Sequence, residues 1–306
     1  LATPKVQEDF PAMCLDTAGT PWVAYVEWKG KADMLKIARK VGGSLKSVGI
    51  LAGPSVIHQP AIACDGKGTI WVIWSQVNSE NVMDIHARSI VNGKIQPKTI
   101  SLAGAPGNVY ADAGTDAAGR VWVAWQSFRN GHADIYTRCY DPAAGDWGKE
   151  IQVTSNKEGD WEPHLAFAEK DTATIVFDSS RNGNFDVYLA KVTLAGKVTL
   201  KQITKSDFYE ARATIAAAPN GKGYWLAWEK GKQGWGKDTR GHGPGPGALG
   251  KGPNMEKFIN VAYRDAATGS VTHPPSARPL LVPPATTPAA QPPANQPPAQ
   301  TQPAPN

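Results

Sequence analysis

A short aromatic and apolar segment returns about every fifty residues along this chain. The first three copies follow an Asp-x-x-Gly turn. The five copies are 22–25, 71–74, 122–125, 174–177 and 225–228, at steps of 49, 51, 52 and 51 residues. A period of this length, with several short strands per unit, is typical of a β-propeller. The sequence therefore predicts an all-β fold, a β-propeller of five visible four-stranded blades.

Three further segments recur with the same period and complete the unit. An apolar segment precedes each aromatic copy, an alternating segment such as 134–138 follows it, and a weaker segment such as 150–154 closes the repeat. Four strands joined by Gly, Asn and Asp turns form one antiparallel blade. The aromatic segments are apolar at nearly every position, so we expect them to lie buried between neighbouring blades, with their Trp residues in the core.

The repeats define the domain organisation. Residues 1–272 are predicted to form one propeller, and residues 273–306 a Pro-rich disordered tail or linker. The tail holds 12 of the 25 prolines and one charged residue, Arg278. Such a composition favours extended conformations and offers little apolar surface to bury.

The last repeat carries a long basic, Gly-rich insertion at 230–257. Three of the chain's net five positive charges lie between residues 229 and 257. With Trp235, this loop could cradle an anion or an acidic glycan, or it could be a loop without a ligand. No phosphate loop or nucleic-acid motif is present, and a net charge of +5 is modest, so we expect no nucleic-acid partner.

Two features bear on the cellular compartment. No segment reaches the roughly 18 apolar residues that a membrane-spanning helix needs. The chain begins at Leu1 without a Met, which indicates a removed signal peptide or an arbitrary boundary. The sequence thus favours a secreted or periplasmic protein. The three cysteines predict no disulfide framework. Cys14 and Cys64 are offset by one position in the repeat, which predicts that they face opposite sides.

The third and fourth repeats are similar in detail to a known family. Residues 126–136, Gln-Ser-Phe-Arg-Asn-Gly-His-Ala-Asp-Ile-Tyr, and the matching 178–188 resemble the repeat of TolB-like β-propellers. The resemblance covers roughly residues 8–272 and implies a periplasmic or secreted, non-catalytic propeller that binds a partner. TolB has six blades and an N-terminal domain, whereas five repeats are visible here. The Asp-x-x-Gly-x-x-Trp turn also has some similarity to sialidase repeats. In the Arg-Asn-Gly turns, we expect Arg129 and Arg181 to pair with the following Asp134 and Asp186.

The entries to the five first strands should converge at the mouth of the central channel, where propellers bind ligands. They are rich in acids, aromatic residues and histidine. Carboxylates and amides can hydrogen-bond sugar hydroxyls, and aromatic faces can pack on a sugar ring or a peptide side chain. The candidate ligand-binding residues are Asp9, His58, Tyr110, Asp112, Trp161, Glu162, His164, Tyr209, Glu210, Arg212 and Trp235. The alternative is a solvated rim whose acids cap turns.

The primary hypothesis is therefore an exported, non-catalytic propeller that binds a protein or a surface carbohydrate at the channel mouth. A second hypothesis is a glycoside hydrolase or lyase, with a general acid and a base among Asp9, Asp112, Glu162 and Glu210. A third is a structural unit of a cell-envelope or extracellular scaffold. No cofactor is expected, and the histidines beside acids are more typical of a rim than of a metal site. Finally, residues 2–7 are predicted to form the outer strand of the last blade beside 258–264, in competition with 270–272.

Overall fold

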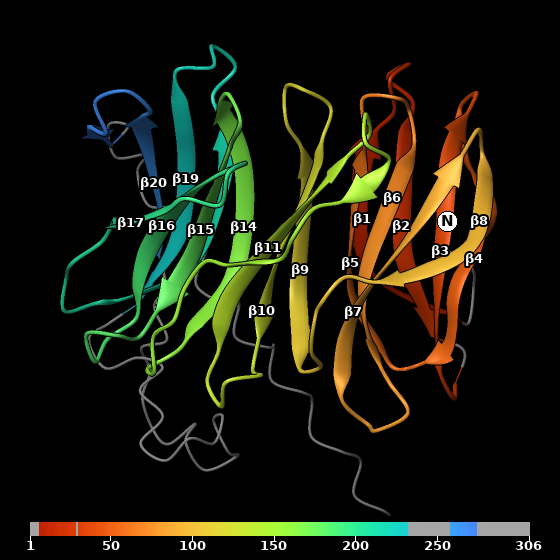
Figure 1. Ribbon diagram of the computed structural model, residues 1–306, viewed down its shortest axis with the longest axis horizontal. Helices are drawn as coiled ribbons and strands as arrows, with labels where there is room; N and C mark the ends of the chain where they lie inside the picture. The colour runs from red at the N-terminus through yellow and green to blue at the C-terminus, as the bar shows by residue number, and fades with distance from the viewer. Residues whose placement is uncertain (1–5, 29, 232–257, 274–306) are drawn as a thin grey trace, which may run out of the picture. The chain divides into compact units, whose positions relative to one another are not determined.

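The computed structural model describes residues 6–28, 30–231 and 258–273, which form five antiparallel sheets (Figure 1). The first sheet consists of β1 (Gln7–Leu15), β2 (Pro21–Trp28), β3 (Asp33–Val41) and β4 (Ser44–Ser55). The second consists of β5 (Ile57–Cys64), β6 (Ile70–Val77), β7 (Met83–Val91) and β8 (Lys94–Ser101). The third consists of β9 (Asn108–Thr115), β10 (Val121–Ser127), β11 (Asp134–Asp141), β12 (Asp146–Trp147) and β13 (Ile151–Gln152). The fourth consists of β14 (Asp160–Glu169), β15 (Thr172–Ser179), β16 (Asp186–Thr193) and β17 (Val198–Gln202). The last consists of β18 (Tyr209–Ala217), β19 (Gly223–Gly231), β20 (Phe258–Asp265) and β21 (Val271–Thr272).

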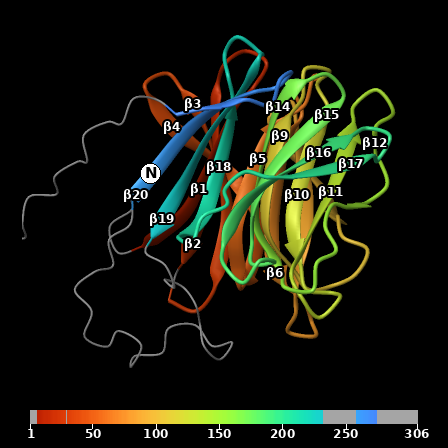
Figure 2. The ribbon, with the colours of Figure 1, turned by 90° about the vertical axis from the view of Figure 1, so that its left-hand side faces the viewer.

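Each sheet is a blade, and the first strands β1, β5, β9, β14 and β18 follow one another side by side (Figures 1 and 2). Within each sheet the strands pair in chain order, apart from the short β12 and β13, which both pair with β11. All of these strands belong to the unit Leu1–His273. The predicted all-β, five-bladed propeller is thus confirmed. In the described ranges, no helix is long and apolar enough to cross a bilayer.

The recurring Asp-x-x-Gly turn fixes the start of a second strand. Asp16 Oδ1 accepts hydrogen bonds from the backbone N–H groups of Ala18 and Thr20, at 2.9 and 2.8 Å. Its other oxygen accepts one from Trp22 Nε1 at 3.0 Å. Asp116 makes the equivalent bond to Trp122. One carboxylate therefore caps the turn and orients the first aromatic side chain of the strand, which explains why Asp, Gly and Trp recur together.

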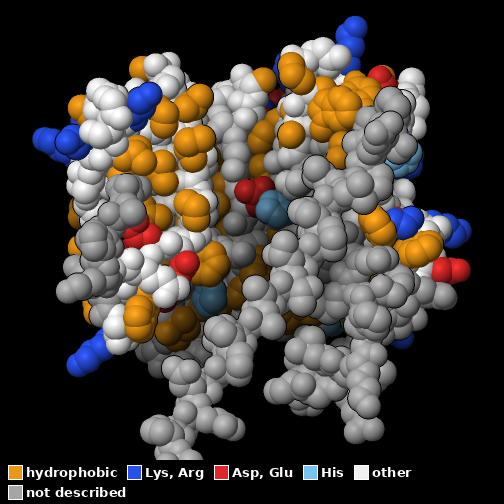
Figure 3. All heavy atoms as spheres, turned by 180° about the vertical axis from the view of Figure 1, so that it is seen from behind, with side chains coloured by type: hydrophobic (Ala, Val, Ile, Leu, Met, Phe, Trp, Pro, Cys, Tyr) orange, Lys and Arg blue, Asp and Glu red, His pale blue; other side chains and the backbone are white. Residues whose placement is uncertain are grey.

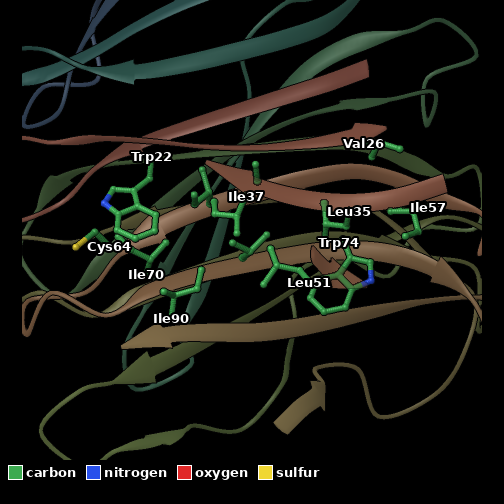
Figure 4. Packing of buried hydrophobic residues seen from close by; sticks show 13 residues of the cluster. Trp22, Val26, Leu35, Ile37, Leu51, Ile57, Cys64, Ile70, Trp74 and Ile90 are labelled. Atoms are coloured by element: carbon green, nitrogen blue, oxygen red, sulfur yellow. The ribbon is translucent and has the colours of Figure 1, made fainter. Parts of the chain in front are cut away.

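Apolar side chains fill the spaces between consecutive blades. Four clusters of buried residues join the first blade to the second, the second to the third, the third to the fourth and the fourth to the last. In the first of them, Trp22 and Ile37 pack with Cys64, Ile70 and Trp74 of the next blade (Figure 4). Most of the recurring Trp residues are buried, as predicted.

The space between the last and first blades differs from the other four. Among the described residues, no buried cluster joins these two sheets. Met13 and Leu15 on β1 remain 66% and 56% exposed, and Trp225 and Ile259 on the last blade 42% and 68%. Figure 3 shows hydrophobic side chains on both sides of a hollow, with acidic and histidine side chains at its centre. Within the part of the chain that the structure describes, the arc of five blades is thus open on this side.

Of two smaller predictions, the one on the outer strand of the last blade was wrong and the one on the cysteines was right. The outer strand of the last blade is β21, which pairs with Tyr263 and Arg264 of β20, whereas Gln7 pairs with Trp28 in the first sheet. Residues 1–5 lie outside the described residues. Cys14 and Cys64 lie on opposite faces of their blades, as predicted, because Cys14 of the first blade and Cys64 of the second both pack in the core between these two blades. All three cysteines are free thiols.

The arginines of the Arg-Asn-Gly turns also differ from expectation. Arg129 Nη1 lies 2.5 Å from Glu150, and Arg181 Nη2 lies 2.8 Å from Asp160. In the first of these turns, Ser127 Oγ accepts a hydrogen bond from Arg129 Nε at 2.8 Å and turns the side chain away from the next Asp. Each guanidinium also lies over a tyrosine ring of the third strand, at 4.0 and 4.2 Å. These contacts hold the hairpin to its own blade, which is a structural role.

Candidate functional site

Every first strand contains a β-bulge at the same position of the repeat. The register shifts after Asp9, His58, Val109, Trp161 and Ala211. The residue that begins the bulge has a positive φ in all five blades, although none of these residues is glycine. They are Phe10 (51°), Gln59 (32°), Tyr110 (56°), Glu162 (49°) and Arg212 (53°), which we call the bulge ring. A bulge re-aims a side chain that a regular strand would direct elsewhere.

The bulge ring surrounds the central cavity. All five of its side chains line a cavity of about 730 Å³, together with the next residues of the first strands. The cavity walls differ in character. The first two blades contribute Phe10, Met13 and Ile62, whereas the third to fifth contribute Asp112, Glu162, His164 and Arg212 among its lining residues. The first two blades thus form a mainly apolar wall that includes Gln59, and the other three form a wall that carries the charge and includes Tyr110.

Side chains from neighbouring second strands hold two of the bulges in place. Gln126 Oε1 on β10 accepts a hydrogen bond from the Glu162 backbone N–H at 3.1 Å. Asp178 on β15 accepts bonds from the backbone N–H groups of Arg212 and Ala213, at 2.6 and 3.3 Å. Gln126 and Asp178 are almost fully buried. The neighbouring blade therefore fixes the positions of Glu162 and Arg212 before any ligand arrives.

Asp112 links two blades inside the cavity. Its Oδ2 accepts a hydrogen bond from the Leu165 backbone N–H at 2.9 Å and lies 3.5 Å from His164 Nδ1. Burial alone would lower the pKa of His164, but hydrogen bonding to Asp112 and its negative charge outweigh burial and raise that pKa. His164 can therefore present its other ring nitrogen as a donor.

Asp178 lies behind the charged wall. Burial raises the pKa of Asp178 to about 7, with a further contribution from the negative charge of Glu162. The two backbone N–H donors oppose this rise. Burial behind the cavity therefore favours the protonated form of Asp178.

The structure brings together five of the candidate residues from the sequence. Tyr110, Asp112, Glu162, His164 and Arg212 line the cavity. Trp235 lies outside the described residues. The other five candidates, Asp9, His58, Trp161, Tyr209 and Glu210, do not line it.

The aromatic and acidic candidates next to the last two bulges point into the blades. Tyr209 is buried, with its ring 5.4 Å from that of Phe185, and burial raises the pKa of Tyr209 to about 12. Glu210 is also buried, and its oxygens accept hydrogen bonds from Ser206 at 2.8 Å and Trp228 at 3.4 Å. Trp161 packs against Phe128, with ring centroids 5.7 Å apart. These side chains support the bulges from outside the cavity.

In the first two blades the sequence prediction missed the cavity residue by one position. Asp9 accepts a hydrogen bond from Gln7, and the ring of His58 lies 5.9 Å from that of Phe10. The bulge directs Phe10 and Gln59 into the cavity instead. One feature of the sequence marks the bulge residue: in three repeats it is followed by a proline, as in Phe10-Pro11 and Gln59-Pro60.

Among the described residues, no group of three or more His, Cys, Asp or Glu side chains is placed to hold a metal ion. The polar groups of the cavity are hydroxyl, amide, carboxylate, imidazole and guanidinium groups set around apolar surface. Such a set suits a polar organic ligand with hydrophobic faces.

Comparison with known proteins places the chain by fold alone. No family model matches it, and no curated protein does. A protein of unknown function from Dyadobacter fermentans superposes with a TM-score of 0.59 at 13% identity, covering 89% of this chain and 84% of that one. A Hadza microbial sialidase gives 0.56 at 11% identity, covering 86% of this chain and 57% of the sialidase. An α-L-arabinanase from Penicillium chrysogenum, complexed with arabinobiose, gives 0.54 at 10% identity, covering 75% and 78%. The chain is a five-bladed β-propeller that resembles arabinanase and sialidase-like propellers in structure.

Proposed function

We propose that this propeller is a non-catalytic carbohydrate-binding protein, exported from the cytoplasm, whose site is the cavity inside the bulge ring. The observation that supports it best is the repeated positive φ at five non-glycine residues, all of which line one cavity. Strained backbone of this kind persists where the surrounding structure enforces it, and it clusters at functional sites.

The chemistry of the two walls agrees with a sugar ligand. Phe10 and Tyr110, both about two-fifths exposed, offer apolar faces for a sugar ring. Gln59, Glu162, His164 and Arg212 offer donors and acceptors for hydroxyl groups. The similarity to TolB-like repeats favours a binding role over catalysis, and a protein ligand is the other outcome that the test must resolve.

The test is a glycan array, run alongside a pull-down from cell-envelope extract. We expect glycans to be bound and Tyr110→Ala to weaken binding about tenfold or more, which is about 1.4 kcal/mol. The matched control is Trp225→Ala, because Trp225 is similarly exposed but is not a lining residue of the cavity. It should keep wild-type affinity.

If the pull-down captures a protein at the cavity and no glycan binds, the ligand is a protein rather than a carbohydrate. Equal loss of binding in the two variants would contradict the assignment to the bulge ring. A melting temperature close to wild type in both variants shows that either result concerns binding rather than folding.

A glycoside hydrolase is the second candidate, and the elevated pKa of Asp178 beside Glu162 favours it, since one acid must stay protonated near neutral pH. However, the carboxylate of Asp178 is bound by two backbone N–H groups, and it does not line the cavity. We therefore expect no turnover of aryl glycosides or polysaccharides. Hydrolysis that disappears in Glu162→Gln would promote this candidate.

A further inference from the structure

Each base in the cavity lining lies beside an acid. His164 Nδ1 is 3.5 Å from Asp112 Oδ2, and Arg212 Nη1 is 3.5 Å from Glu229 Oε1. The side chains of the two bases are 47% and 55% exposed, whereas those of their acidic partners are 29% and 21% exposed. Each pair therefore presents its base to the cavity and keeps its acid close behind.

Glu162 acts on both of these pairs. Burial alone would lower the pKa of Arg212, but the negative charges of Glu229 and Glu162 outweigh burial and raise that pKa. Burial would lower the pKa of His164 as well, and the charge of Glu162 adds to the effect of Asp112 in raising it. Among the described residues, every charged side chain of the lining thus has an opposite charge close by.

This arrangement gives little attraction to a charged group on a ligand. A ligand carboxylate that approached Arg212 would also meet Glu162 and Glu229, and a ligand ammonium group at Glu162 would meet the two bases. A charged group also loses its water when it enters a cavity. The charges of the lining are already paired, so they do not offset that cost.

The same pairs are well suited to hydroxyl groups. A hydroxyl group both donates and accepts hydrogen bonds, so it can contact the N–H of a base and the oxygen of an acid in the same place. His164 and Arg212 supply donors to the cavity, and Asp112 and Glu162 supply acceptors. None of these contacts requires an existing pair to separate.

We propose that the cavity binds neutral glycans, whose sugars carry neither an acidic nor a free amino group, and that the paired charges around Arg212 exclude charged glycans. This inference rests on the proposed carbohydrate-binding function. Hydroxyl groups of the sugar would bind to the charged pairs, while Phe10 and Met13 cover its carbon-bound face. Binding would form no new ion pair.

The test is the glycan array, with neutral glycans displayed beside their charged counterparts. One comparison is the N-acetylglucosamine tetramer with the glucosamine tetramer, and the other is the methyl-esterified galacturonate tetramer with the free acid. Every glycan that binds at the cavity should be uncharged, and we expect it to bind at least about tenfold more tightly than its charged counterpart, which is about 1.4 kcal/mol. Its Kd should not change as salt is raised, because there is no new ion pair to screen.

Two variants separate this inference from the proposed function. Arg212→Gln removes the base between Glu162 and Glu229, so it should bind the glucosamine tetramer about tenfold more tightly than wild type does. The matched control is Lys94→Gln, which removes an exposed base outside the cavity lining and should leave this affinity unchanged. Tighter binding of a charged glycan than of its neutral counterpart by wild type, or no gain in Arg212→Gln, would overturn the inference alone. Failure of every glycan to bind at the cavity would overturn the proposed function as well.

Discussion

At the scale of single residues, the bulge ring is the feature that most needs explanation. Phe10, Gln59, Tyr110, Glu162 and Arg212 all have left-handed backbone, which glycine would adopt without strain. Hydrogen bonds from a neighbouring blade hold the bulges of Glu162 and Arg212. These bonds offset the cost of the left-handed backbone at Glu162 and Arg212. The bulges in turn direct the side chains into the cavity.

Asp178 provides a prediction about pH at this scale. Its folded pKa of about 7 lies above the unfolded value of about 3.9 for Asp. The folded state therefore binds this proton more tightly, and the stabilisation that it contributes is present below pH 4 and is lost as pH rises through 7. We expect the free energy of unfolding of wild type, relative to Asp178→Asn, to fall between pH 4.5 and 7.5.

Chemical denaturation of both proteins at several pH values measures this difference. Each unit of difference between the folded and the unfolded pKa corresponds to about 1.4 kcal/mol in the free energy of unfolding. This conversion gives the largest change that we expect. A difference between wild type and Asp178→Asn that stays constant, or grows, with rising pH would show that Asp178 is ionised in the folded protein throughout.

At the scale of elements, the sequence was enough to predict the strands but not the bulges. The repeat identified the aromatic second strands, because burial on both faces leaves an apolar run. It also placed Tyr110, Glu162 and Arg212 at the cavity. The flanking Trp161 and Tyr209 were expected there too, but a bulge adds one residue and so exchanges the faces on which neighbouring side chains lie. Local pattern alone does not reveal such a shift.

Two tryptophans at equivalent positions of the repeat test the packing between blades. Trp122 on β10 is fully buried, whereas Trp225 on β19 is 42% exposed, because no blade among the described residues covers it as the fourth blade covers Trp122. Trp122→Ala should destabilise the protein by about 3–5 kcal/mol. Trp225→Ala should cost less than about 1 kcal/mol. The measurement is the free energy of unfolding in denaturant; similar losses in both variants would mean that the last blade is covered as well as the others.

At the scale of the whole propeller, four interfaces between blades are filled and the fifth is open among the described residues. Counting repeats could not reveal this, because the repeat specifies each blade and its neighbours but not the closure of the arc. The cavity inside the bulge ring combines contributions from all five blades. Its ligand chemistry is therefore a property of the assembled arc rather than of any single repeat.

The most direct measurement is a crystal structure of the propeller with a glycan that the array identifies. We expect electron density for the sugar inside the bulge ring, with one face against Phe10 or Tyr110 and a polar group within hydrogen-bond distance of Glu162. A glycan bound only outside the cavity, with the bulge ring unoccupied, would contradict it.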